Sequence, residues 1–330
     1  GDGAIEIRAL DWSDLPAVFR QRNQVLYLDS ALRLTHGSPF TLAGMLTRLR
    51  PSNEFFTAVA PAADGAGPLI GQVSYRGGEK CARLTYLLPL NELSSPALPA
   101  LLEALAWQAG EWGAFHLLAE VDERSPAFEG LRAAGFSTYA RQRVWRLDAP
   151  LSALPAPNHW RAAASVDEQA VRNLHAQVMP PLVQAAEPLH LRLSHGLVFY
   201  QKDELAAYVE TVSGPAGIFV RPLIHPDVEE TPALLTSLVA RLRPEPNRPV
   251  YAAVRSYEAW LEPLFEDLGA SVGPRQALLV RHLANAARVM QALPRLGVLE
   301  KRVEPGAPIA RSMQVNGEKP SAASYKSQEP

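Results

Sequence analysis

One stretch, residues 80–136, constrains the fold more than any other part of the chain. Residues 80–89 (KCARLTYLLP) are rich in apolar side chains and end at a proline, which predicts a strand. A loop follows at residues 90–95. Leucine, alanine and tryptophan then recur at helical spacing between Leu98 and Trp112, so we expect a helix with one buried face.

The second part of this stretch repeats the alternation of strand and helix. Residues 116–122 (HLLAEVD) form a short, nearly continuous apolar run, typical of a central strand that is covered on both faces. Ser125 is a suitable helix N-cap, Pro126 suits the first turn, and Gly135 is placed to end the helix. The predicted order is therefore strand, loop, helix, strand, helix and a Gly-Phe pair.

Length and composition limit the class of protein. A chain of 330 residues is too long for one ordinary domain, so we expect two domains and a tail. The net charge of -2 argues against nucleic acid or an anionic membrane as a partner. The single cysteine, Cys81, excludes an internal disulfide and, within an apolar strand, favours a core residue. Because we find neither a signal peptide nor an apolar run long enough to span a membrane, we expect a cytoplasmic protein.

The same order of elements occurs twice along the chain. In the first half, strands are also expected before and after the central stretch, at residues 4–10, 54–60, 69–76 and 138–147. From residue 159 the pattern starts again, with a strand, a helix, a three-strand meander, a helix, a strand and a helix that is closed by Gly269. Two long copies indicate a tandem duplication rather than a repeat array.

We therefore expect an α/β fold with two tandem domains, at residues 1–148 and 159–284. A short proline-rich linker would join them at residues 149–158. Residues 285–330 would form one short helix and a disordered tail, because they are largely polar and rich in proline, glycine and serine. Each domain is expected to build its own mixed sheet, and a single continuous sheet would contradict this organisation.

The order of elements ending in Gly135 and Phe136 resembles the core of the GNAT-type N-acetyltransferases, and the resemblance covers both halves. It implies an acyl-CoA N-acyltransferase-like domain in each half. In that family the strand before the loop splays from its neighbour. A glycine-rich loop and the following helix N-terminus hold the pyrophosphate of acetyl-CoA, and the second helix commonly carries a tyrosine that acts as general acid.

In the first half, the resemblance implies that acetyl-CoA would contact Leu87, Leu88, Ser94, Ser95 and Ala97. The loop has no glycine to let the backbone approach a diphosphate closely. Ser94 and Ser95 can offer hydroxyls to the anion, or they can simply cap the helix.

Two prolines in this loop, Pro96 and Pro99, each remove an amide donor. Each lost hydrogen bond to a charged oxygen is worth about 1.5–3 kcal/mol. Acetyl-CoA would therefore bind weakly, and no metal is expected.

In the second half, the corresponding loop is short and lacks glycine. Asp227, Glu229 and Glu230 would repel a diphosphate. We expect this half not to bind coenzyme A in the manner of the family, which leaves the first half as the more plausible cofactor binder.

The family's catalytic tyrosine corresponds to Leu131 in the first half and Phe265 in the second, and neither can donate a proton. Other side chains that could act as acid or base lie on the predicted strands. The candidates in the first half are Tyr75, Tyr86 and Glu120. Those in the second half are Tyr208, Glu210 and His225.

Three functions remain open at this stage. The chain could transfer an acetyl or other acyl group from coenzyme A to an amine of a small molecule or peptide. It could instead be a non-catalytic binding or scaffold protein that keeps the fold without the cofactor site. A groove between the two halves could also bind a small ligand unrelated to coenzyme A.

Overall fold

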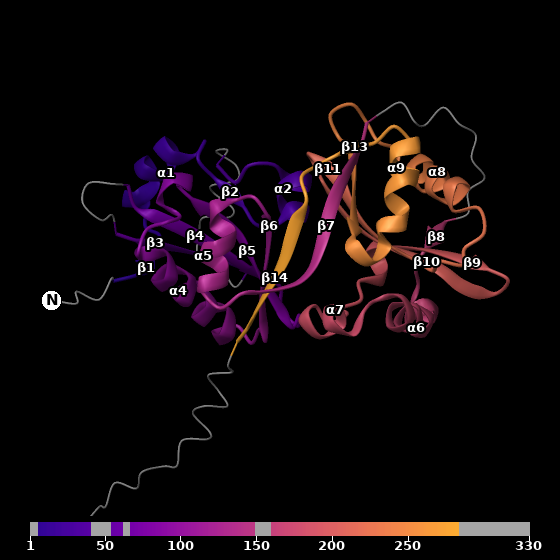
Figure 1. The fold of residues 1–330 in the computed structure, drawn as a ribbon, viewed down its shortest axis with the longest axis horizontal. Helices are drawn as coiled ribbons and strands as arrows, with labels where there is room; N and C mark the ends of the chain where they lie inside the picture. The colour runs from indigo at the N-terminus through magenta and orange to yellow at the C-terminus, as the bar shows by residue number, and fades with distance from the viewer. Residues whose placement is uncertain (1–5, 41–53, 62–66, 149–159, 284–330) are drawn as a thin grey trace, which may run out of the picture. The chain divides into compact units, whose positions relative to one another are not determined.

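The computed structural model describes residues 6–40, 54–61, 67–148 and 160–283 (Figure 1). We call residues 6–148 the first half and residues 160–283 the second half. The predicted linker at 149–158 and the predicted tail at 285–330 lie outside the described residues.

The first half follows the predicted order of strands and helices, with additional short elements near its start. Its elements are β1 (Arg8–Ala9), η1 (Trp12–Asp14), α1 (Leu15–Gln21), β2 (Leu26–Tyr27), α2 (Ser30–His36), β3 (Phe55–Ala60), β4 (Leu69–Tyr75), β5 (Cys81–Leu88), η2 (Leu90–Glu92), α4 (Ala97–Glu111), β6 (His116–Asp122), α5 (Pro126–Ala133) and β7 (Ser137–Leu147).

The second half repeats this order. Its elements are β8 (Arg161–Ala162), η4 (Ser165–Asp167), α6 (Glu168–Val178), α7 (Pro181–Ala186), η5 (Leu193–His195), β9 (Gly196–Gln201), β10 (Glu204–Gly214), β11 (Gly217–Ile224), α8 (Thr231–Leu242), β12 (Val250–Arg255), η6 (Ser256–Leu261), α9 (Glu262–Asp267), β13 (Ser271–Val272) and β14 (Gln276–His282).

A matched pair of ion pairs shows that the two halves are copies of one unit. Arg8 contacts Asp14 through two hydrogen bonds of 2.6 Å, six residues apart. Arg161 contacts Asp167 in the same way, at 2.8 and 2.6 Å and again six residues apart. Each aspartate also accepts a main-chain N–H from three residues earlier. In the second half, the Asp167 carboxylate accepts the Ala164 N–H and fixes the turn that leads into α6.

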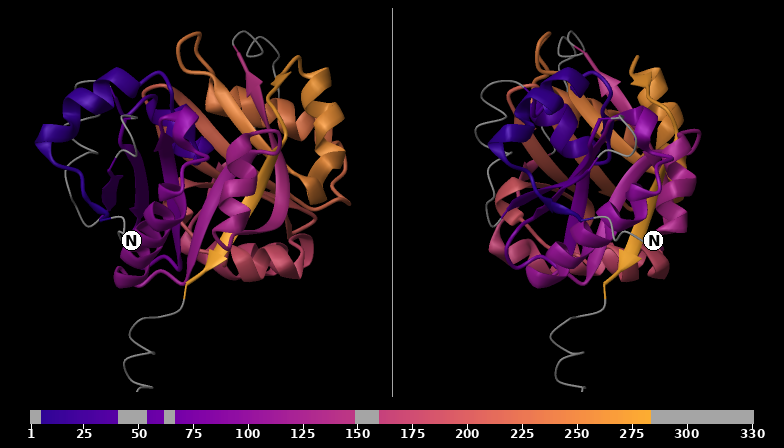
Figure 2. Two further views of the ribbon diagram at one scale, coloured as in Figure 1. Left: turned by 60° about the vertical axis from the view of Figure 1, so that its left-hand side comes forward. Right: turned by 90° about the vertical axis from the view of Figure 1, so that its left-hand side faces the viewer.

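The two halves exchange their last strands. Residues 142–147 of strand β7, in the first half, pair with β12 of the second half. Strand β14 of the second half lies between β6 and β7 and pairs with both (Figures 1 and 2). The strands of the described residues consequently form one 14-stranded sheet, so the expectation of two separate sheets is wrong. Sequence periodicity identifies strands, but it does not say which half supplies each neighbour.

The helices α2 and α7 also cross between the halves. Ala31 and Leu34, on α2, pack against Phe219 and Ala253 of the second half. Val183 and Ala186, on α7, pack with Cys81 and other buried residues of the first half. Each half therefore covers part of the other half's sheet, and the space that remains between them holds the site described below.

The main cores follow the predicted apolar faces. In the first half, α4 and α5 pack on the sheet around residues that include Leu84, Leu101, Leu117 and Leu131. In the second half, α8 and α9 do the same around residues that include Val220, Leu238, Val254 and Phe265. Cys81 is buried, as expected, and Ser125 accepts the N–H of Ala127 as an N-cap.

Candidate functional site

The strand β5 leaves its neighbour β6 after a short parallel contact. The two strands pair at Cys81, Ala82 and Arg83 and then diverge. This is the splay that the resemblance predicts, and it would be the entry for the thioester arm of acetyl-CoA.

A segment of the chain itself occupies this splay in the first half. Strand β2 pairs with β5, with Leu26 opposite Leu87 and Tyr27 opposite Tyr86. The N–H of Leu28 donates to the carbonyl oxygen of Thr85, and the N–H of Glu120 donates to the carbonyl oxygen of Leu28, both at 2.9 Å. Leu28 is 1% exposed. The main chain at residues 26–28 therefore makes the hydrogen bonds on the splayed edge of β5 that an extended ligand would need.

The loop that follows β5 uses its amides internally. It forms the short helix η2 instead of an open loop. The N–H groups of Glu92 and Ser95 donate to carbonyl oxygens of Pro89 and Glu92, at 3.1 and 2.9 Å. The Ser95 hydroxyl accepts the N–H of Ala97 at 3.2 Å, so Ser95 serves the start of the helix.

The residues predicted to bind the cofactor do not face one common site. Leu87 and Leu88 are both fully buried but belong to different apolar clusters. Ser94 is exposed, and Ala97 is buried at the start of α4.

The second half closes the matching edge by different means. Strands β11 and β12 pair from Ile218 to Val220 and then diverge. Every second residue of β11 should direct its N–H toward β12, and the N–H of Ile218 donates to the carbonyl oxygen of Pro249 in this direction. Further along β11, Pro222 has no N–H, and the N–H of Ile224 donates to Glu258 at 3.4 Å.

The helix that follows this edge begins among acidic side chains, as the sequence predicted. Glu230 precedes α8 in a left-handed conformation, with φ of 55°. Glu229 pairs with Lys202 at the surface. In the described residues of both halves, most of the backbone donors that would hold the thioester arm and diphosphate of acetyl-CoA are therefore engaged within the chain or missing, and these residues do not fit that cofactor.

The residues predicted to be catalytic in the first half also lie apart. Tyr86 packs edge-on against Phe40, with ring centroids 5.1 Å apart. The Tyr75 hydroxyl donates to the carbonyl oxygen of Glu79 at 3.0 Å, and its ring stacks on Trp112. The structure therefore gives these two tyrosines separate surroundings.

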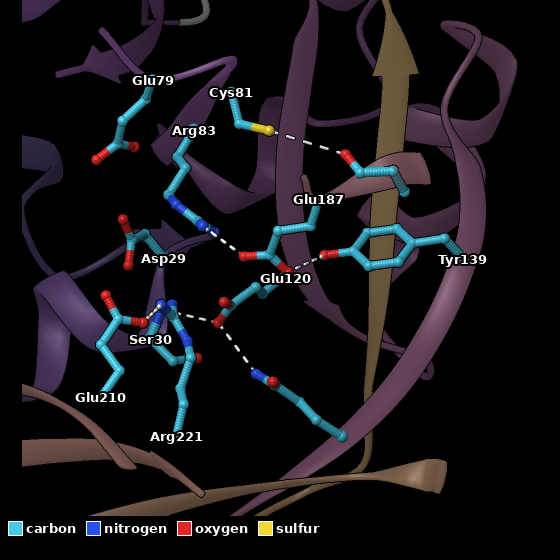
Figure 3. A network of polar contacts seen from close by, with 12 residues as sticks. Asp29, Ser30, Glu79, Cys81, Arg83, Glu120, Tyr139, Glu187, Glu210 and Arg221 are labelled. Atoms are coloured by element: carbon cyan, nitrogen blue, oxygen red, sulfur yellow. Dashed lines mark hydrogen bonds and ion pairs between the residues drawn. The ribbon is translucent and has the colours of Figure 1, made fainter. Parts of the chain in front are cut away.

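The third predicted catalytic residue, Glu120, is buried and held by its neighbours (Figure 3). One carboxylate oxygen of Glu120 accepts the N–H of Ser30 at 3.0 Å and the side-chain N–H of Gln142 at 3.2 Å. These bonds tie β6 to the start of α2 and to β7.

A cavity with a volume of about 520 Å³ lies between the two halves. The first half contributes α2 and the ends of β4 and β5, and the second half contributes the segment after α7 and parts of β10, β11 and β12. Three sequence candidates line it, namely Tyr75, Tyr208 and Glu210. Burial raises the pKa of the Tyr208 hydroxyl, so this group is a proton donor only to a strong base.

Glu187 lines this cavity and connects the two halves (Figure 3). Arg83 of the first half and Arg255 of the second half each donate to its carboxylate, at 2.6 and 2.5 Å. The Tyr139 hydroxyl donates to the same carboxylate at 3.1 Å. Burial alone would raise the pKa of Glu187, but the two guanidinium groups outweigh it and hold the pKa well below its usual range.

Two further ion pairs line the same cavity. Arg221 donates to Glu210 at 3.3 Å, and Arg192 contacts Glu79 across the halves. Glu258 is 1% exposed, and burial raises the pKa of its carboxyl to about 8 even though the Ile224 N–H and Arg255 oppose the shift. At neutral pH this carboxyl is mainly protonated.

Sequence reasoning missed the central residues of this site. Arg83 is the third residue of the apolar strand β5 and Arg255 is the last residue of β12, and a charged residue that must be buried with its strand is a usable signal. Glu187 lies just after α7 and follows no pattern that marks it.

The described part of the chain contains no cluster of three or more histidine, cysteine or acidic side chains that could hold a metal ion. None of the helices described is both long and apolar enough to cross a membrane.

Comparison with solved structures identifies the architecture. A GCN5-related N-acetyltransferase from Sphaerobacter thermophilus superposes with a TM-score of 0.50 and 16% identity, over 84% of this chain and 96% of that one. The chain has the GNAT fold. A tandem GNAT protein from the clavulanic acid biosynthesis pathway is also similar, with a TM-score of 0.46, 17% identity and coverage of 85% and 99%. No family model matches the chain, and no curated protein matches it.

The GNAT fold, with two tandem units, confirms the fold class predicted from the order of elements. The domain limits at residues 148 and 159 stay a prediction, because the halves share a sheet and the boundary falls outside the described residues. A shared fold does not carry activity with it, so function must be argued from the site itself.

Proposed function

We propose that this chain is a binding protein built on the GNAT fold, that it takes a small molecule into the cavity between its halves, and that it does not use acetyl-CoA. The observation that carries the proposal is the closure of both splayed edges. Strand β2 covers β5 in the first half, and Pro222 with Glu258 removes the donors of β11 in the second half.

A thioester arm could bind in the first half only by displacing residues 26–28 of the chain. To enter the first half, a thioester arm would have to replace the backbone hydrogen bonds of residues 26–28 and expel Leu28 from a fully buried position. Exposing a leucine side chain alone costs about 1.5–3 kcal/mol. Few loop amides are available in return, because Glu92, Ser95 and Ala97 already donate within the chain.

Acyl transfer to an amine is the second candidate function. One observation favours it, because Tyr75, Tyr208 and Glu258 line the same cavity, and a carboxyl with a pKa of about 8 can exchange a proton near neutral pH. Such an enzyme would need to take up acetyl-CoA by a route other than the family's loop.

Calorimetric titration of acetyl-CoA into the full chain tests the proposal. We expect no binding by the wild type or by a variant with Ser95→Gly and Ala97→Gly, since restoring loop flexibility leaves β2 on the edge of β5. Micromolar binding by the wild type, together with acetylation of an amine, would overturn the proposal and favour the enzyme.

A further inference from the structure

Three arginine side chains that line the cavity, Arg83, Arg221 and Arg255, use few of their N–H donors within the described part of the chain. Arg83 and Arg255 each donate one hydrogen bond to Glu187, Arg255 also bonds Tyr257, and Arg221 donates one to Glu210. A guanidinium carries five N–H donors, so three of them present about fifteen. Among the described residues, these bonds leave most of the donors for water or a ligand.

The three arginine side chains that carry these donors are largely shielded from solvent. The side chain of Arg255 is 7% exposed and those of Arg83 and Arg221 are 21% and 20% exposed. Arg83 and Arg221 extend toward the same space from β5 and β11 (Figure 3). Charged donors at such depth gain most from an acceptor that carries negative charge.

Two acidic groups of the same cavity, Asp29 and Glu258, accept main-chain hydrogen bonds. Asp29 accepts the N–H of Leu32 as the cap of α2, at 2.9 Å, and Glu258 accepts the N–H of Ile224. At the rim, burial and the neighbouring Arg76 lower the pKa of Arg192, while Glu210 opposes the shift.

We propose that the ligand of this cavity carries an oxyanion, either a carboxylate or a phosphate, that accepts hydrogen bonds from Arg83 of the first half and Arg221 of the second half. The inference rests on the proposed binding function and names the chemistry of its ligand. Because the two arginines come from different halves, the bound oxyanion would join them.

The test uses the full chain in a buffer free of phosphate and carboxylate. Inorganic phosphate and succinate are titrated separately by calorimetry, with 1,4-diaminobutane as a cationic probe of similar size. We expect phosphate or succinate to bind at millimolar concentration or better. Binding of phosphate alone indicates a phosphate ester as the ligand, and binding of succinate alone indicates a carboxylic acid.

Arg221→Gln provides the decisive variant. Loss of one charge-assisted hydrogen bond should weaken oxyanion binding about tenfold or more. Arg146→Gln is the control, because it removes an exposed arginine of β7 that pairs with Asp148. This variant should leave oxyanion binding unchanged. If Arg221→Gln folds poorly because Glu210 loses its partner, the double variant Arg221→Gln with Glu210→Gln removes both charges and should show the same loss.

Three outcomes would overturn the inference: no binding of either anion, equal binding by wild type and the Arg221 variants, or preferential binding of the diamine. None of these outcomes depends on acetyl-CoA, so they are separate from a failure of the proposed function. A phosphate group of coenzyme A that entered this cavity would be displaced by inorganic phosphate, whereas a thioester arm bound along β5 would not.

Discussion

The main-chain N–H of Leu28 donates to the carbonyl oxygen of Thr85 at 2.9 Å, so the chain supplies its own strand to the splayed edge of β5. If this segment is part of the folded core, Leu28→Ala should lower the free energy of unfolding by about 2–5 kcal/mol. Guanidinium denaturation measures the change. Leu182→Ala, at a side chain that is 63% exposed, is the matched control and should change stability by less than about 0.5 kcal/mol. Equal effects of the two variants would contradict the insertion.

Glu187 compensates two buried guanidinium groups at once, and its removal should be costly. Glu187→Gln leaves Arg83 and Arg255 without their shared carboxylate, which should destabilise the fold by about 3–5 kcal/mol. Glu229→Gln removes an exposed ion pair at the surface, with Lys202, and should destabilise the fold far less. Denaturation midpoints of the two variants give the comparison, and a small effect at Glu187 would show that the bridge is not needed for folding.

The Glu258 carboxyl should make stability depend on pH. Its pKa is about 8 in the folded chain, against a usual value of 4.5. The folded state therefore binds a proton that the unfolded state has already released in this interval. Glu258 should lower stability as pH rises from about 4.5 to about 8, with a slope of up to about 1.4 kcal/mol per pH unit. The midpoint of thermal unfolding should fall more steeply with pH across this interval for the wild type than for Glu258→Gln. Identical dependences on pH would contradict the assignment.

The repeated ion pairs allow one half to serve as control for the other. Asp167 accepts the hydroxyl of Tyr200 at 2.7 Å in addition to its two bonds from Arg161, and its side chain is 1% exposed. Asp14 has the matching bonds from Arg8 and is 10% exposed. Asp167→Asn should therefore destabilise the chain more than Asp14→Asn, by about 1.5 kcal/mol, as expected for one hydrogen bond to a charged group.

The pH dependence at Asp167 has the opposite direction to that at Glu258. The hydrogen bond from Arg161 holds the pKa of Asp167 below its usual value of 3.8. Its contribution is complete above that pH and is lost as the pH falls below about 4. Wild type and Asp167→Asn should therefore converge in stability in acid, and a constant difference would contradict this reading.

The exchange of strands predicts that the first half does not fold alone. Residues 1–148 lack β14, which lies between β6 and β7 in the complete chain. The exposed edges of β6 and β7 would then be unpaired. Expressed separately, this fragment should unfold without a cooperative transition, and adding residues 159–284 should restore one. Cooperative unfolding of the isolated fragment would show instead that β6 and β7 can pair directly.

The sequence predicted most elements of the fold because local patterns determine them. The strand at β6, the helix at α5 and its Ser125 cap depend on apolar periodicity and on a local hydrogen bond. The exchange of β7 and β14 could not be predicted, because both strands present similar edges and only tertiary contacts select the partner.

The candidate site was harder to predict for the same reason. The missing glycines and the two prolines predicted an altered loop after β5, and the structure has the short helix η2 there. The segment that fills the splay, β2 and the following Leu28, is too short for its pattern to be recognised. Arg83, Glu187 and Arg255 are far apart in the sequence and meet only when the halves dock.

The position of β14 has a consequence for how the chain is made. Protein synthesis delivers β6 and β7 long before the ribosome releases residues 276–282. The centre of the sheet must therefore stay open during most of translation, and it closes only when the last strand arrives. For this chain, completion of the first copy is one of the final events of folding rather than one of the first.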